Sequence, residues 1–333
     1  MLKRYLSSSA FCGFLLIALV SLLSCKKLDM DIDLHIDSHV NDVKKDSMVH
    51  VNICVLGNSY SNDSFSYVPF ILMEYGVTSN IHIYYRGSLS LHDLDEQWED
   101  DSEFGLADID GGKHNRFHFS IDTRERRYWR KEQIMSAKDI VEMEDWDIIT
   151  VQQGGNRCKK EETYYPYLQN VIDKIDVSRG DSCSLAWFMA YNGAKDNKNE
   201  ESIQVQEKIT REFPFNFVMP VATAIFSCQE NETLSLLGDS QYHRMYASDN
   251  VHLQEGLPCY IAALTVAQSI LNALGIEKSI EGDAIRPTQE WISSINGITQ
   301  NGQSIGVTEE NCALAQRAAI QANEHPFEII PIQ

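Results

Sequence analysis

An almost unbroken apolar run that ends in Gly-Asn-Ser constrains the fold of this chain more than any other feature. Residues 51–61 read Val-Asn-Ile-Cys-Val-Leu-Gly-Asn-Ser-Tyr-Ser. A strand that is buried on both faces is typically a continuous hydrophobic run, and a glycine just past its end permits a tight turn. The run therefore predicts a buried strand that delivers Ser59 to the rim of a sheet, where open α/β sheets bind their ligands.

The rest of the chain alternates expected strands with expected helices. The strands are expected at 49–56, 80–86, 146–151, 185–191 and 215–221, and the helices at 67–75, 168–175, 205–213 and 260–274. Short apolar or alternating runs indicate the strands, and apolar residues three and four apart indicate the helices. Alternation of this kind predicts an α/β fold in which helices cover both faces of a parallel sheet.

The two ends of the chain are expected to lie outside this main domain, 49–280. Residues 1–24 have a positive start and a short apolar stretch, and they resemble a bacterial lipoprotein signal in which Cys25 becomes the acylated N-terminus. A plain secretory signal, with Cys25 as a bystander, is the alternative. Residues 25–48 are expected to form a flexible, solvated tether, and 281–333 a C-terminal helical appendage.

Residues 88–140 interrupt the alternation of strands and helices. An acidic run at 93–103 is followed by a basic, aromatic segment at 116–131, in which alternate residues from Phe117 to Ile121 are apolar, as in a short strand. A tract of this length is expected to be an insertion over one rim of the sheet. A surface excursion whose two charge blocks pair with each other is the simpler interpretation.

Charge and cysteine content exclude several classes of function. The chain carries 28 Lys and Arg against 48 Asp and Glu, a formal net charge of −20, which argues against a protein that tracks nucleic-acid phosphates. The cysteines after Cys25 form no Cys-x-x-Cys pair, so no zinc or iron–sulfur site is expected. Cys54 and Cys259 lie in apolar contexts and are expected to pack in the core.

Residues suited to acyl transfer follow several of the expected strands. Ser59 follows the first, Gly87 the second and residues 153–156 the third, and a parallel sheet brings these ends to one rim. Asp249 and His252 precede the last expected helix, so their loop returns to that rim if its connections are short. A serine nucleophile needs an imidazole to take its proton and a carboxylate to orient that imidazole, and the oxyanion needs N–H donors.

Each piece also has a simpler interpretation when it is taken alone. Gly-Asn-Ser is ordinary turn chemistry, Asp249 is suited to capping the helix that follows it, and a lone histidine in a loop is usually structural. Ser61 is a rival nucleophile, although it lies two residues further from the strand than Ser59. The candidate triad therefore depends on the pieces occurring together and in order.

In that order, the pieces resemble the four sequence blocks of the SGNH (GDSL-type) hydrolase superfamily. The matches are Gly57-Asn58-Ser59, Gly87, Gly154-Gly155-Asn156 and Asp249-x-x-His252, within roughly residues 49–275. The lipoprotein-like start and the segments 146–147 and 218–221 also resemble SGNH-like lipoproteins of gut bacteroidetes. The resemblance implies a flavodoxin-like, three-layer α/β/α fold with a five-stranded parallel sheet in the order 2-1-3-4-5.

The resemblance also implies a role for each matching residue. It makes Ser59 the nucleophile, His252 the base and Asp249 its partner, with the N–H groups of Ser59 and Gly87 as oxyanion donors. The third block departs from the family's usual Gly-x-Asn-Asp, so the side-chain donor is either Asn156, the literal counterpart, or Gln153, nearer the strand end.

The implied function is an exported serine esterase that needs no metal or cofactor. Its expected substrates are small acyl esters, in the first place acetyl groups on carbohydrates, and its expected location is the bacterial cell envelope, on a lipid anchor that faces the periplasm or the cell surface. One alternative is a lipoprotein that binds a glycan or a partner at the same cleft without turning it over. Another is a lipase or lysophospholipase.

Overall fold

The computed structural model describes residues 48–333, apart from 110, 180–181, 197, 230, 236–244, 283–284 and 296–304. The expected signal sequence, Cys25 and all but the last residue of the expected tether lie outside the described residues. In the part that is described, no helix combines the length and the apolar character needed to cross a membrane.

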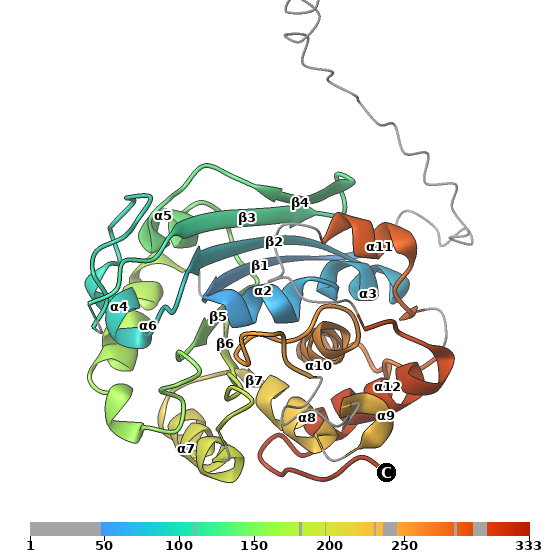
Figure 1. Ribbon diagram of the computed structural model, residues 1–333. Helices are drawn as coiled ribbons and strands as arrows, with labels where there is room; N and C mark the ends of the chain where they lie inside the picture. Colours follow the sequence, from blue (N-terminus) through green and yellow to red (C-terminus); the bar gives the residue numbers. More distant parts are fainter. Residues whose placement is uncertain are drawn as a thin grey trace, which may run out of the picture. The chain divides into compact units, whose positions relative to one another are not determined.

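A mixed sheet of seven strands forms the centre of the fold (Figure 1). The strands are β1 (Val49–Gly57), β2 (Val77–Arg86), β3 (Arg116–Asp122), β4 (Arg127–Lys131), β5 (Ile148–Gln152), β6 (Ser184–Phe188) and β7 (Phe217–Met219). They lie in the order β4-β3-β2-β1-β5-β6-β7. The block β2-β1-β5-β6-β7 is parallel, and β3 and β4 are antiparallel to their neighbours. The expectation of five strands is therefore wrong, because the sheet has two more.

Both additional strands come from the segment expected to be an insertion over the rim. β3 pairs antiparallel with β2 and continues the sheet sideways, and its side chains Phe119 and Ile121 are buried. The charge blocks of the segment also meet, since Arg116 forms an ion pair with Asp100 at 3.0 Å. Part of the segment thus extends the sheet, and its charges are paired as the simpler interpretation expects.

Two groups of helices pack around the sheet (Figure 1). The helices are α2 (Ser59–Phe65), α3 (Val68–Glu74), α4 (Leu91–Glu96), α5 (Ala137–Glu142), η1 (Glu161–Thr163), α6 (Tyr167–Ser178), α7 (Asn199–Glu212), α8 (Val221–Cys228), α9 (Glu232–Ser235), α10 (Leu257–Ala273), α11 (Gln289–Ser294) and α12 (Glu309–Glu324). Helix α10 packs against α2, α3, α8 and α12, whereas α6 packs against α4 and α5. The strands between them are buried almost throughout.

The C-terminal segment packs against the main domain. Helix α12 lies against α10 and α8, and its buried side is made largely of small side chains that permit a close approach: Cys312, Ala315, Ala318, Ala319 and Ala322. The chain after it is bonded to the α8 region, because Thr223 Oγ1 donates to the carbonyl of Pro326 at 2.5 Å. Residues of α12 thus contribute to the core.

Candidate active site

Ser59 is the first residue of α2, at the point where β1 ends. Asn58 caps this helix: its backbone is extended, with φ of −130°, and its side-chain oxygen accepts a hydrogen bond from the Tyr60 N–H at 3.0 Å. Asparagine is among the residues preferred at this position, so Gly-Asn-Ser itself builds the turn from strand to helix. Ser59 is 8% exposed and lies at the carboxyl edge of the parallel strands.

The segment that precedes α10 brings the two other expected residues to Ser59. The Nε2 atom of His252 lies 2.6 Å from Ser59 Oγ, and its Nδ1 atom is hydrogen bonded to Asp249 Oδ2. The other oxygen of Asp249 accepts hydrogen bonds from the N–H groups of Val251 at 2.9 Å and of His252 at 3.1 Å. The hydroxyl, the imidazole and the carboxylate therefore form one hydrogen-bonded chain.

The surroundings of Asp249 favour its ionised form. Burial raises the pKa of this carboxyl, but the hydrogen bonds from the His252 ring and from the N–H groups of Val251 and His252 together lower it more, and the net pKa lies below its usual value. An ionised acceptor at Nδ1 keeps a proton on that nitrogen, which leaves Nε2 free to accept the proton of Ser59.

The N–H group of Gly87, an expected oxyanion donor, is already bonded. It donates to the carbonyl of Asn115 at 3.2 Å, because the chain that enters β3 runs beside it. In the described part of the chain, the N–H groups of Ser59 and Ser88 have no hydrogen-bond partner. Ser88 occupies the turn after β2 with φ of +56°. The free backbone donor of the second block is thus Ser88, where Gly87 was expected.

The structure also separates the two amides considered for the third block. Gln153 is fully buried; its NH₂ group donates to the carbonyl and the hydroxyl of Thr163 at 3.0 and 3.2 Å. Its oxygen accepts from the N–H groups of Leu91 and Gly154 at 3.1 and 2.9 Å. Asn156 is exposed, and its side chain has no partner among the described residues. Only Asn156 has its amide free to meet a substrate.

A second set of polar residues, which sequence analysis missed, fixes the start of α2. The buried Ser61 hydroxyl donates to the oxygen of Gln152, so it is engaged away from His252. The NH₂ group of Gln152 donates to Asn58 at 2.8 Å, and that of Asn58 donates to the Leu89 carbonyl at 3.0 Å. A Cβ atom at Gly57 would overlap the Ser61 hydroxyl and lie 2.7 Å from the Gln152 oxygen. Glycine is therefore required there.

Two more residues of α2 lie close to His252 and were not anticipated. The ring of Tyr60 packs edge-on against Tyr191, with centroids 4.4 Å apart, and its centroid lies 6.2 Å from that of His252. Asp63, one helical turn after Ser59, is fully buried. Its spacing of four from Ser59 is the one signal that could have identified it, and this signal has meaning only once α2 is known to be a helix.

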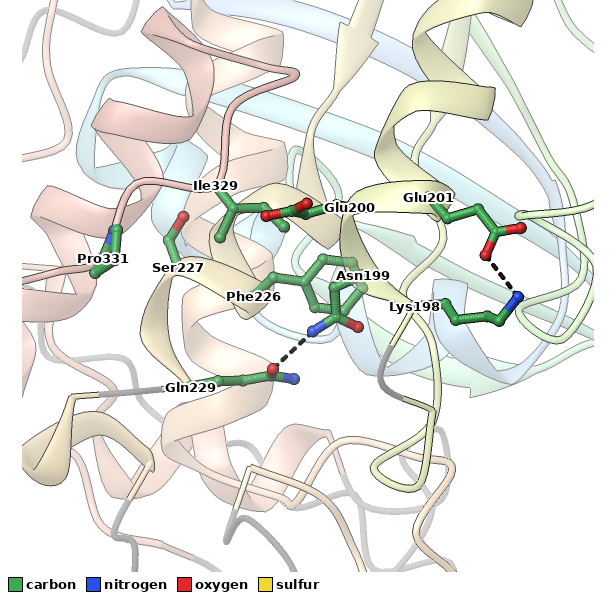
Figure 2. Close-up of a pocket in the computed structure, with 9 residues that line it drawn as sticks. All are labelled: Lys198, Asn199, Glu200, Glu201, Phe226, Ser227, Gln229, Ile329 and Pro331. Carbon is green, nitrogen blue, oxygen red and sulfur yellow. Dashed lines mark hydrogen bonds and ion pairs between the residues drawn. The ribbon is translucent and has the colours of Figure 1, made fainter.

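The features outside this cluster do not suggest a different site. Among the described residues, no three His, Cys, Asp or Glu side chains are grouped so as to hold a metal ion, and the six cysteines from Cys54 to Cys312 are buried. A cavity of about 460 Å³ lies between the start of α7, helix α8 and the C-terminal tail, and its lining residues are drawn in Figure 2. None of the residues described above lines it.

Comparison with known proteins identifies the fold. No protein-family model and no curated protein matches the chain. Its structure is similar to that of a DUF4886 family protein from Bacteroides uniformis, with 18% identity, a TM-score of 0.63 and coverage of 84% of this chain and 97% of that one. At this identity, the match shows a shared fold.

Two further solved structures are similar at a lower level. One is a candidate SGNH hydrolase from Slackia heliotrinireducens, with 13% identity, a TM-score of 0.42 and coverage of 66% of this chain and 99% of that one. The other is a gut microbial diltiazem-metabolizing enzyme, with 14% identity, a TM-score of 0.36 and coverage of 69% of this chain and 48% of that one. The chemistry proposed below therefore rests on the side chains of this chain.

Proposed function

We propose that this protein is an exported serine esterase that hydrolyses small acyl esters, in the first place acetyl esters on carbohydrates. The hydrogen-bonded chain from Ser59 through His252 to Asp249 carries the proposal. Three residues separated by up to 193 positions in the sequence meet in the arrangement that acyl transfer requires. The carbohydrate and the acetyl group come from the resemblance to SGNH hydrolases alone.

In the proposed reaction, Ser59 Oγ attacks the ester carbonyl carbon while His252 Nε2 takes the hydroxyl proton. The N–H groups of Ser59 and Ser88 and the amide of Asn156 are the donors available to the oxyanion of the tetrahedral intermediate. When the carbon–oxygen bond of the ester breaks, His252 returns the proton to the departing alcohol. Water then attacks the acyl-enzyme with His252 again as the base, and the carboxylic acid and free Ser59 are released.

Labelling with a fluorophosphonate and hydrolysis of an activated acetyl ester test the proposal. Wild-type protein should be labelled and active, and Ser59→Ala should be neither. The matched control is Ser61→Ala, since Ser61 lies on the same helix with its hydroxyl bonded to Gln152, and this variant should still be labelled. Equal labelling and equal turnover of wild type and Ser59→Ala would rule the proposal out.

A binding protein of the same shape is the second candidate, and the engaged donors favour it. Two of the expected oxyanion donors, the Gly87 N–H and the Gln153 amide, have other partners. Tight binding of an acylated glycan, with no turnover by wild type and no loss of affinity in Ser59→Ala, would support this function over the esterase.

A lipase is the third candidate, and an exposed apolar segment is the observation in its favour. Phe104, Leu106 and Ile109, between α4 and β3, are 57%, 56% and 52% exposed. A lipase should hydrolyse long-chain esters faster than acetate, whereas the esterase that we propose should be fastest on acetate. Rates on a series of esters of increasing acyl length separate the two.

Export and anchoring are a separate part of the proposal and rest on the sequence. We infer that Cys25 is acylated after cleavage of the preceding signal. Radiolabelled fatty acid should then be incorporated into the wild-type protein and be found in its membrane fraction, and Cys25→Ala should lose both. Fatty-acid labelling that survives Cys25→Ala would contradict the anchor without affecting the esterase.

A further inference from the structure

Asp63 is a buried carboxylate that the proposed reaction does not use. It lies on α2, four residues after Ser59, and no part of it is exposed. Its Oδ2 atom accepts hydrogen bonds from the N–H of Leu253 at 3.0 Å and from the hydroxyl of Tyr191 at 2.9 Å. Its Oδ1 atom has no partner among the residues that the structure describes. A buried carboxylate with a free oxygen is unfavourable for stability, so its presence needs an explanation.

The bond to Leu253 joins the histidine loop to the helix that carries the nucleophile. Leu253 directly follows His252, so a fixed Leu253 N–H limits where the imidazole lies. Asp249, which orients the ring, belongs to the same loop and has a side chain that is 45% exposed. Asp249 therefore fixes the ring relative to the loop, whereas Asp63 fixes the loop relative to Ser59.

The charge of Asp63 is also placed to act on His252. The titratable groups that face it are Tyr60 on α2, Tyr85 on β2, Tyr191 after β6, Cys259 on α10, and Asp249 and His252 on the loop. Of these, only His252 becomes positive when it binds a proton. The ionised carboxylate therefore favours the imidazolium that forms when Ser59 attacks.

The net effect on Asp63 is a titration close to neutral pH. Burial raises its pKa to about 7, although the attraction of His252 and the hydrogen bonds from Leu253 and Tyr191 oppose the rise. The carboxylate is therefore mostly ionised only above that pH.

We propose, given the esterase activity proposed above, that Asp63 is a positioning residue that holds the His252 imidazole against Ser59 through the Leu253 N–H and stabilises the imidazolium with its charge. One helix then carries both the nucleophile, at its first residue, and the anchor of the base, at its fifth. One turn of α2 then sets the distance between Ser59 and His252, because the exposed loop that carries His252 is held to that turn by Asp63.

The test compares Asp63→Asn with Tyr191→Phe. Asparagine keeps an acceptor for Leu253 but removes the charge, so kcat should fall about 100-fold with little change in KM. The acid limb of kcat/KM and the midpoint of the His252 imidazole titration, followed by NMR, should move to lower pH by about half a unit. Tyr191→Phe keeps the carboxylate and the Leu253 bond, so both midpoints should stay in place and kcat should fall less than about tenfold.

Three outcomes decide between the alternatives. Unmoved midpoints in a folded Asp63→Asn protein overturn the proposal, since a merely structural residue would change stability alone. The wild-type protein supplies a second test that needs no variant, because the Leu253 amide proton resonance should titrate with Asp63 near pH 7. A resonance that stays flat between about pH 5 and pH 9 also overturns the proposal. Neither NMR measurement requires catalytic turnover. Failure of the esterase proposal is therefore recognised separately, by a Ser59→Ala variant that is as active as the wild type.

Discussion

Gly155, in the loop after β5, is a position where a single added methyl group should damage the site. A Cβ atom there would lie 2.5 Å from the hydroxyl oxygen and 2.6 Å from Cζ of Tyr60, and closer still to Cε2. Ordinary contact begins at 3.4 Å, so the ring or the loop must retreat by about 1 Å. Because no left-handed φ is involved at Gly155, the effect of Gly155→Ala is steric alone.

The ring of Tyr60 has little room in which to retreat. It is 7% exposed, Tyr191 packs edge-on against it, and His252 lies beyond it. Overpacking of this kind destabilises proteins by about 1–3 kcal/mol. Tyr60 directly follows Ser59, so a shift of the ring carries the hydroxyl with it, and a misplacement of about 1 Å between reacting groups lowers rates by about 100-fold. Gly155→Ala should show both losses.

A double-mutant cycle with Tyr60→Ala tests this reasoning. Measured by urea unfolding, Gly155→Ala should lower the free energy of unfolding by about 1–3 kcal/mol in the wild-type background. In the Tyr60→Ala background, where the ring is gone, the same substitution should lower it by less than about 0.5 kcal/mol. Gly306→Ala is the control, because a Cβ atom there meets nothing within 4 Å. If the stability losses of Gly155→Ala and Tyr60→Ala simply add in the double variant, the ring is not the obstacle and the steric argument fails. Acetyl ester hydrolysis by Gly155→Ala, measured in parallel under conditions where the variant is still folded, should fall by about 100-fold.

Three further comparisons have definite expected outcomes. The pKa of Asp63 is about 7 in the folded protein and near its ordinary 3.8 in the unfolded chain, so the free energy of unfolding should fall by up to about 4 kcal/mol as the pH rises between these values. Urea unfolding of Asp63→Asn should lack this fall. Parallel pH profiles of the wild type and the variant would contradict the assignment. Asn156→Ala should lower kcat by about 100-fold without changing stability, whereas Gln153→Ala should destabilise the protein by about 1–3 kcal/mol. If kinetics and thermal melts show the reverse pattern, Gln153 is the amide that acts on the substrate and Asn156 the structural one. Ser64→Ala removes a buried hydroxyl that has no partner in the described part of the chain. Its free energy of unfolding in urea should rise by about 1 kcal/mol, and a loss of stability would contradict this.

The central part of the sheet could be predicted because its strands are nearly pure hydrophobic runs. Residues 51–56 and 148–151 have no polar face, which only a strand between two layers tolerates. The Gly-Asn-Ser turn could be predicted as well, because a glycine just past the end of a strand permits a tight turn. Ser59 could therefore be placed on the carboxyl edge of the sheet from the sequence, and the Asp249–His252 pair could be placed there on the condition that its connections are short.

The antiparallel edge could not be predicted, because the evidence for it is not local. β3 alternates as a strand does, but its partner β2 is 30 residues earlier in the chain, across a tract of acidic and glycine-rich sequence. Nothing in residues 116–122 says whether they pair with the sheet or with themselves. The same pairing takes up the Gly87 N–H through Asn115, which leaves the N–H of Ser88 as the unbonded donor of that turn within the described chain.

Helix α2 was missed for a different reason, and that reason bears on its function. Its sequence, Ser-Tyr-Ser-Asn-Asp-Ser-Phe, is poor in helix-forming residues, and all seven residues are buried, where polar side chains are expensive. Three of these side chains are each bonded to a different element: Ser59 to His252, Ser61 to Gln152 and Asp63 to Tyr191. Because residues at positions one, three and five reach the histidine loop, β5 and the chain after β6, the helix fixes these elements relative to one another. Greater stability alone would favour apolar residues here, so the polar sequence is best explained by the geometry it holds around Ser59.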